Sequence, residues 1–197
     1  MRVTVVRHAA PHVTDDVPPH VWPLSRAGRV AARGLRLPEG ARAVASDERK
    51  AVETLSLALG VADVPTDPRF GEIRRPPEPV SPEFREARRA WVEGAPDTRH
   101  DGWESAEGAA RRFDDAVRDH AGRGDLVVGT HGMVLTAWLV ATGRVAPGPS
   151  AGAFWLGLRL PDVVTVDLAG DDDGDPRGCA GPRRAKAAGL RRRPRPR

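Results

Sequence analysis

Two short apolar runs that each lead to a histidine do most to restrict the fold of this chain. Residues 2–6 and 125–130 are rich in valine and other β-branched residues, a pattern typical of strands buried inside a parallel sheet. Arg7 and His8 follow the first run, and His131 follows the second run directly. Parallel sheets bind ligands beside the carboxyl ends of their strands. We therefore expect both histidines to lie where a functional site would form.

The rest of the chain alternates between helix and strand patterns. Ser25 is expected to cap a helix, and a second short strand at 41–45 precedes a helix that closes near Gly60. Prolines interrupt the stretch 65–82, so we expect an irregular loop there. We predict later helices and a closing β-hairpin as follows: helices over about 82–93, 104–120 and 133–142, and hairpin strands at 153–160 and 163–168. This order predicts an α/β fold of three layers, in which helices flank a mostly parallel sheet.

Charge divides the chain into two parts. The isoelectric point near 10.4 would suit a nucleic-acid-binding protein. However, residues 169–197 hold nine basic and four acidic residues, whereas residues 1–168 hold 22 basic and 23 acidic residues. A near-neutral body argues against nucleic acid as a partner. Because the last 29 residues are dense in Gly, Pro and charge, we expect a disordered basic tail at 169–197 after one domain at 1–168.

Cysteine usage and hydropathy bear on the compartment and on cofactors. The single cysteine, Cys179, excludes a disulfide framework and a Cys-rich metal site. None of the six histidines pair three or four apart on a predicted helix, so we expect no metal. No glycine-rich nucleotide loop is present, and we expect no cofactor. No apolar run approaches a bilayer span and no signal-peptide pattern follows Met1, so we expect a cytoplasmic protein with no membrane partner.

Five short motifs follow one another along the chain. They are VVRHA at 5–9, LSRAG at 24–28, ASDERKAVET at 45–54, GWES at 102–105 with Arg112 downstream, and GTHG at 129–132. In this order they resemble the motifs of the histidine phosphatase superfamily, the phosphoglycerate-mutase-like proteins, over nearly all of residues 2–168. The resemblance implies a phosphoglycerate-mutase-like fold and an enzyme that hydrolyses small phosphorylated substrates through a phosphohistidine. Ala9 stands where the family has glycine.

The resemblance also implies roles for particular residues. His8 would be the nucleophile, while Arg7 and His131 would stabilise the charge on the transferring phosphoryl group. Lys50 occupies the position of the family's phosphate-binding arginine, and Arg49 falls one residue earlier. One residue turns a helical side chain by about 100°. Because Lys50 is one of only two lysines in the chain, we assign the phosphate contact to it.

The resemblance places a general acid in a loop after the second predicted helix. Glu72 is the best match, with Glu78 and Glu104 as substitutes. This carboxylic acid would protonate the leaving alkoxide and later activate water to hydrolyse the phosphohistidine. His12 follows Pro11 and could reach the opening of the expected pocket to bind phosphate. A position on the surface, away from the pocket, is an equal expectation.

Three alternatives stay open at this point. A phosphoglycerate mutase would return the phosphoryl group to a second oxygen, although the chain is short for the insertions that resemble mutase lids. A non-catalytic module that binds a phosphorylated ligand is a second reading, because the changes at Ala9 and Lys50 both fall in the expected pocket. Binding of nucleic acid through the basic tail is a third. The substrate and the oligomeric state are not decided by these patterns.

Overall fold

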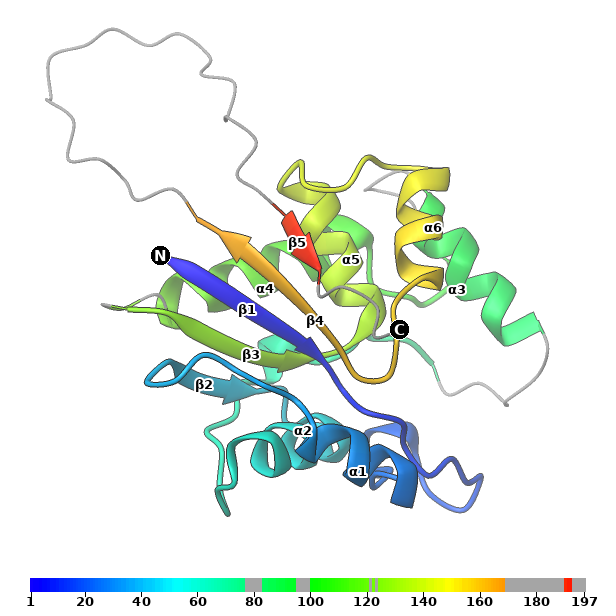
Figure 1. Ribbon diagram of the computed structural model, residues 1–197. Coiled ribbons are helices and arrows are strands. Elements are labelled where there is room, and N and C mark those ends of the chain that lie inside the picture. The colour runs from blue at the N-terminus through cyan, green and yellow to red at the C-terminus, as the bar shows by residue number, and fades with distance from the viewer. Residues whose placement is uncertain (77–82, 95–99, 121, 123, 169–189, 193–197) are drawn as a thin grey trace, which may run out of the picture.

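A five-stranded sheet forms the centre of the molecule in the computed structural model, which describes residues 1–76, 83–94, 100–120, 122, 124–168 and 190–192. The strand order is β2-β3-β1-β4-β5 (Figure 1). The strand bounds are β1 Arg2–Arg7, β2 Arg42–Ala45, β3 Leu126–Thr130, β4 Asp162–Asp167 and β5 Leu190–Arg192. Strands β1, β2 and β3 are mutually parallel, and β4 is antiparallel to its neighbours β1 and β5. Among the described strands, only β4 runs against the others.

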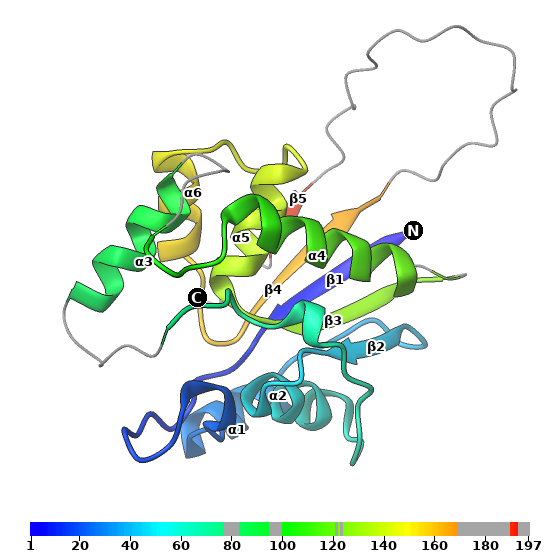
Figure 2. The same cartoon turned by 180° about the vertical axis from the view of Figure 1, so that it is seen from behind.

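Helices cover both faces of this sheet (Figures 1 and 2). One face carries α1 and α2, the other carries α4 and α5, and α3 and α6 pack beside α5. The helix bounds are α1 Arg26–Arg33, α2 Arg49–Leu59, α3 Glu83–Glu93, α4 Ala106–His120, α5 Gly132–Ala141 and α6 Pro149–Leu156. The predicted three-layer α/β fold is confirmed. No helix in the described part of the chain combines the length and the apolar character needed to cross a membrane.

The two central strands bury side chains on both faces, which explains their unbroken apolar sequence. Val3, Val5 and Val128 pack in the core formed with α4 and α5. Val6 and Val127 pack on the opposite face, against the helix α2. Successive side chains of a strand point to opposite faces, so both registers of β1 and β3 must be apolar when helices cover both sides.

Pairing between β1 and β3 brings the two histidines together. The strands are parallel, and Arg7 is in register with Thr130. The backbone N–H of His8 then donates to the carbonyl oxygen of Thr130 at 2.9 Å. His8 and His131 therefore leave neighbouring strands at the same edge of the sheet. The sequence patterns predicted that each histidine follows the carboxyl end of a strand, and the pairing of β1 with β3 makes the two strands neighbours.

The predicted β-hairpin near the carboxyl end is wrong in its first half. Residues 153–156 belong to the helix α6, and only β4 forms a strand. Pro149 at the start of α6 suits a helix N-terminus, and the buried residues Ala151, Gly152 and Trp155 lie on one helical face. A Cβ on Gly152 would lie 2.0 Å from a carboxylate oxygen of Glu93 in α3. The small residue therefore lets α3 and α6 pack closely, a contact that no local pattern reveals.

Most of the predicted tail lies outside the described residues. The exception is Leu190–Arg192, which forms β5 and pairs with β4, so these three residues differ from the predicted disorder. The register sets Val164 opposite Arg192 and Val166 opposite Leu190. An edge strand offers unpaired N–H and C=O groups to any extended segment, because the hydrogen bonds involve the backbone alone. Charge and proline content are therefore poor guides to such a pairing.

Candidate active site

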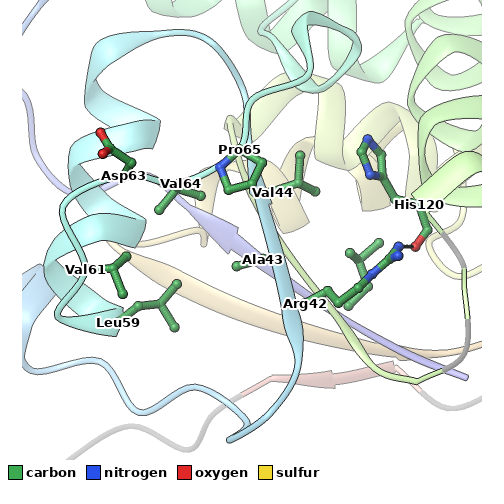
Figure 3. A pocket seen from close by; sticks show the side chains of 10 residues that line it. Arg42, Ala43, Val44, Leu59, Val61, Asp63, Val64, Pro65 and His120 are labelled. Atoms are coloured by element: carbon green, nitrogen blue, oxygen red, sulfur yellow. Dashed lines mark hydrogen bonds between the residues drawn. The ribbon is translucent and has the colours of Figure 1, made fainter.

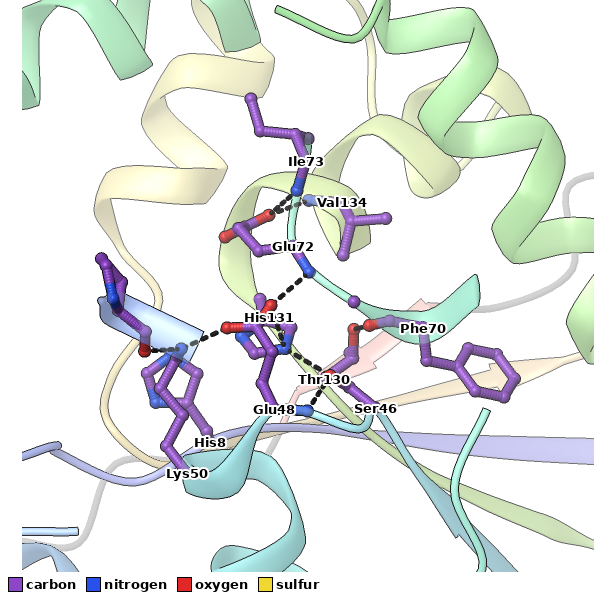
Figure 4. A network of polar contacts seen from close by, with 12 residues as sticks. His8, Ser46, Glu48, Lys50, Phe70, Glu72, Ile73, Thr130, His131 and Val134 are labelled. Carbon is purple, nitrogen blue, oxygen red and sulfur yellow. Dashed lines mark hydrogen bonds and ion pairs between the residues drawn. The ribbon is translucent and has the colours of Figure 1, made fainter. Parts of the chain in front are cut away.

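The two histidines form the centre of the candidate site (Figure 4). Their ring centroids are 5.1 Å apart and the ring planes are inclined by 56°. The side chain of His131 is fully buried, and His8 is 9% exposed. His8, His131, Lys50 and Glu72 come from four separate segments of the chain and lie in one network (Figure 4).

A backbone hydrogen bond orients the His8 ring. Its Nδ1 lies 2.8 Å from the carbonyl oxygen of Ala9, which can only accept, so Nδ1 carries the proton and Nε2 keeps its lone pair. The N–H of Ala9 donates to the Thr54 hydroxyl at 2.9 Å. The Ala9 methyl group is buried beside Leu24 and Ala32. The alanine at this position therefore packs without disturbing the loop that holds His8.

The LSRAG motif holds the same loop through its next residue, Ala10. Both the N–H and the hydroxyl of Ser25 donate to the carbonyl oxygen of Ala10, each at 3.0 Å. The Ser25 hydroxyl also accepts from the N–H of Gly28, which confirms the predicted N-cap. A Cβ on Gly28 would lie 2.1 Å from the Ala10 oxygen. Only glycine at this position allows α1 to approach the loop so closely.

Lys50, rather than Arg49, points into the site. The Lys50 side chain is 7% exposed, and its Nζ donates to the Pro19 carbonyl oxygen at 2.8 Å and to the carboxylate of Glu48. The Arg49 side chain is 55% exposed and pairs with Glu53 on the surface of α2. Lys50, which the motif register selects, is therefore the buried cation near the two histidines, whereas Arg49 lies on the surface.

Glu48 is a central residue that the sequence reasoning missed. Its Oε2 accepts from Lys50, and its Oε1 accepts from the backbone N–H of Glu72 at 2.8 Å. The same Oε1 lies 3.2 Å from Nε2 of His131. The one available signal was its position inside the ASDERKAVET motif, between Ser46 and Lys50.

His131 and Arg7 both have a buried nitrogen with no hydrogen-bond partner among the described residues. His131 Nε2 bonds to the Ser46 hydroxyl at 2.9 Å, and its Nδ1 is unpartnered. Arg7 donates through one terminal nitrogen to the carbonyl oxygen of Leu158 at 2.8 Å, and its Nε is unpartnered. A Cβ on Gly132 would lie 3.2 Å from the Arg7 guanidinium, so this glycine makes room for it. Buried polar atoms without a partner often mark a ligand site, and Arg7 Nε is a donor of this kind.

The Glu72 carboxylate is held at the start of α5. Its Oε1 accepts from the N–H groups of Ile73 and Val134 at 3.1 and 3.0 Å, and its Oε2 accepts from that of Met133 at 3.3 Å. The N-terminus of a helix favours a negative charge. The side chain is half-buried, so it is oriented and still reachable from solvent.

Arg112 and Glu104 hold the loop that carries Glu72. Arg112 binds both oxygens of Glu104 at 2.8 and 2.9 Å and donates to the carbonyl oxygens of Arg69, Gly71 and Glu72. Burial acts to raise the pKa of Glu104, but the hydrogen bonds from Arg112 and from the Arg74 backbone hold it below its usual value. Glu104 is therefore held as a carboxylate in an ion pair with Arg112 that supports the loop, which makes it a poor substitute for the general acid.

Two other predicted residues lie apart from this network. The side chain of His12 is exposed, and its described hydrogen bond is from the backbone N–H to the Pro23 carbonyl oxygen at 2.7 Å. Glu78 lies outside the described residues. Within the described ranges, no three His, Cys, Asp or Glu side chains form a group that could hold a metal ion.

A pocket of about 490 Å³ lies elsewhere on the molecule (Figure 3). Ala43, Val44, Leu59 and Val64 contribute apolar side chains to its wall, and His120 lies at one end. None of the residues of the histidine network line it. The pocket therefore adds nothing to the chemistry of the candidate site.

Burial keeps both histidines neutral. The pKa of His8 is lowered well below its usual value by burial first, and then by the nearby His131 and Lys50. The pKa of His131 is lowered in the same way by burial and then by Lys50, against a weaker raising effect of Glu72. A neutral imidazole retains the lone pair that a nucleophile needs.

We expect the free energy of unfolding to fall as the pH drops below about 6.5, the ordinary imidazole pKa. Below that pH the unfolded chain binds protons at His8 and His131 that the folded chain excludes, so the folded state loses stability. Each histidine contributes a slope of up to about 1.4 kcal/mol per pH unit. Urea unfolding at pH 7.5, 6.5 and 5.5 measures this slope. His131→Gln should reduce it and His12→Gln should leave it unchanged, and a slope that His131→Gln does not reduce would contradict the expectation.

Comparison with known proteins identifies the family. A model of the histidine phosphatase superfamily (branch 1) matches residues 3–149. The chain belongs to the histidine phosphatase superfamily. The resemblance inferred from the five motifs is confirmed. Within the superfamily's motifs, this member carries Ala9 in place of glycine and Lys50 in place of arginine, and the packing described above accommodates both changes.

Solved structures have the same fold. The protein TTHB049 from Thermus thermophilus is 25% identical, with a TM-score of 0.58 over 85% of this chain and 94% of its own. A mycobacterial glucosyl-3-phosphoglycerate phosphatase is 20% identical, with a TM-score of 0.66 over 97% of this chain and 96% of its own. The complex of that phosphatase with inorganic phosphate is 22% identical, with a TM-score of 0.59 over 84% of this chain and 89% of its own. No curated protein sequence matches the chain.

Proposed function

We propose that this protein hydrolyses phosphomonoesters through a phosphohistidine formed on Nε2 of His8. The observation that carries the proposal is the bond from His8 Nδ1–H to the Ala9 carbonyl oxygen inside a buried pair of histidines. This bond leaves Nε2 as a neutral, oriented nucleophile, and nucleophilic catalysis needs such a group. Membership of the superfamily supports the same chemistry.

The first step transfers the phosphoryl group to the enzyme. The lone pair on His8 Nε2 attacks phosphorus, the N–P bond forms, and the bond from phosphorus to the ester oxygen breaks. Negative charge on the three equatorial oxygens is stabilised by Arg7, Lys50 and the N–H of His131. Arg7 Nε supports this role, because it is buried without a partner among the described residues.

Glu72 is the proposed proton donor. Its protonated carboxyl group gives the proton to the leaving oxygen, so the alcohol departs neutral and the carboxylate remains. In the second step that carboxylate takes a proton from water, the water oxygen attacks phosphorus, and the N–P bond breaks to release phosphate. The hydrogen bonds at the start of α5 orient Glu72 and stabilise the carboxylate that the first step leaves, the form that takes a proton from water in the second step.

A small phosphorylated metabolite is the expected substrate class. The solved structures that this chain resembles include a phosphatase of glucosyl-3-phosphoglycerate, a small phosphorylated compound. At 20% identity this relationship supports the fold and leaves the particular ester open. A cytoplasmic location stays a prediction from the sequence.

Trapping the intermediate tests the proposal directly. Wild-type protein mixed with a panel of small phosphomonoesters and quenched in denaturant should carry phosphate on His8 that is labile to acid and stable to base, detected by peptide mass spectrometry. His20→Gln, a change at an exposed histidine, should trap the same amount. Release of inorganic phosphate distinguishes hydrolysis from transfer to a second hydroxyl, which a mutase would perform. Turnover of the panel without phosphate on His8 would refute the proposal.

A further inference from the structure

The Glu48 carboxylate lies among three hydrogen-bond donors of the site. Its two oxygens face the Lys50 ammonium, the His131 ring and the backbone N–H of Glu72 (Figure 4). A carboxylate can only accept hydrogen bonds, so its approach to His131 favours the tautomer that carries the proton on Nε2. The three groups are hydrogen-bond donors that converge on one oxyanion.

Glu48 does not serve the role that its place in the chain would suggest. It is the residue directly before α2, where the side chain of Ser, Thr, Asp or Asn commonly caps the first N–H groups of the helix. Here the Glu48 side chain makes no capping hydrogen bond. Both oxygens are engaged by the site, and the side chain is only 14% exposed.

We propose that Glu48 is a built-in competitor for the phosphoryl position. A phosphate oxyanion has the same need for donors as a carboxylate, and Lys50 and His131 cannot serve both fully. For an ester to bind, the Glu48 side chain must turn away toward solvent, which its remaining exposure allows. This inference rests on the proposed function and adds a control of ligand affinity to it.

Displacement of Glu48 costs the same free energy for every ligand that binds in its place, so this competition weakens the binding of all oxyanions by one common factor. A doubly charged phosphate monoester gains more from Lys50 and Arg7 than a singly charged carboxylate or phosphodiester gains, because the Coulomb attraction scales with charge. The ratio of the affinities for dianions and monoanions therefore comes from this attraction alone. The cost of displacing Glu48 lowers both affinities, so binding stays appreciable only for ligands whose attraction exceeds that cost. The same cost also limits retention of the phosphate product.

Binding of inorganic phosphate at pH 7.5, measured by calorimetry, tests the inference without turnover. Glu48→Gln and Glu48→Ala remove the competing charge, so each should bind phosphate at least about tenfold more tightly than wild type, or about 1.4 kcal/mol. Glu107→Gln is the matched control, because it removes one carboxylate from an exposed pair with Arg111. It should bind as wild type does. Thermal unfolding establishes that each variant is folded, and either folded Glu48 variant is sufficient for the comparison.

The outcomes separate this inference from the proposed function. Glu48 variants that bind phosphate no more tightly than wild type overturn the inference, even if His8 is phosphorylated. Tighter binding by both variants supports it, even if no phosphohistidine is trapped and the proposed function fails. Equal tightening by Glu107→Gln would show a general effect of net charge and would overturn the inference.

Discussion

Replacing His8 with alanine should lower kcat/KM for phosphomonoester hydrolysis by at least about 10³, or about 4 kcal/mol of transition-state stabilisation. In the proposed mechanism only His8 attacks phosphorus, and His131 acts as a hydrogen-bond donor through Nε2, which lies beside Ser46 and Glu48. Stability should change little, since the described side-chain contacts of His8 are the bond to Ala9 and the ring contact with His131. Steady-state kinetics on the best ester of the panel, together with thermal unfolding, measure both quantities.

His20→Gln is the control for the loss of a histidine, because its side chain is exposed. It should keep wild-type kinetics. If His8→Ala retains activity within about tenfold of wild type, a difference of only about 1.4 kcal/mol, covalent catalysis by His8 is wrong. Activity lost together with a large drop in melting temperature would assign His8 a structural role instead.

Replacing Lys50 with alanine should lower kcat by about 10²–10³, as expected for loss of one preorganised donor to the transition state. The Lys50 side chain is 7% exposed beside both histidines, so its charge acts in a region with little screening by water. Lys50→Arg should retain more activity than Lys50→Ala, because it keeps the positive charge. Single-turnover measurements of phosphohistidine formation isolate the effect on the chemical step.

Arg49→Ala is the matched control for this prediction. Arg49 also lies in the first turn of α2 and is also cationic, but it pairs with Glu53 on the surface. Its loss should change kcat by less than about twofold, since exposed ion pairs contribute little. An inactive Arg49→Ala beside an active Lys50→Ala would show that the assignment of the phosphate-binding cation is wrong. The double variant Lys50→Ala with Glu48→Ala should recover part of the loss, because an unpaired carboxylate no longer repels the phosphate.

Local sequence patterns were sufficient to predict those elements whose conformation depends on a few consecutive residues. The valine-rich runs, the Ser25 cap and the αL residue Gly60 that ends α2 are properties of a few consecutive residues, and the structure has these elements near the predicted positions. The helix α6 was missed because its buried face packs against α3, where Gly152 lies beside Glu93, and this contact cannot be read from nearby residues. The strand β5 was missed because backbone pairing with β4 does not depend on side-chain pattern.

The sequence by itself determined that His8 and His131 follow two buried parallel strands, whereas the pairing of β1 with β3 brings the two residues together. The resemblance to the superfamily's motif indicated Lys50 over Arg49, and one residue of register in a helix gives a side chain a different direction. Only the tertiary structure decided that Glu48 lies among hydrogen-bond donors of the site, and that Arg112 and Glu104 hold the loop of Glu72. These contacts join segments that are far apart in the chain. Their strength depends on how deeply the groups are buried and on the charges of the surrounding elements, which local sequence patterns do not contain.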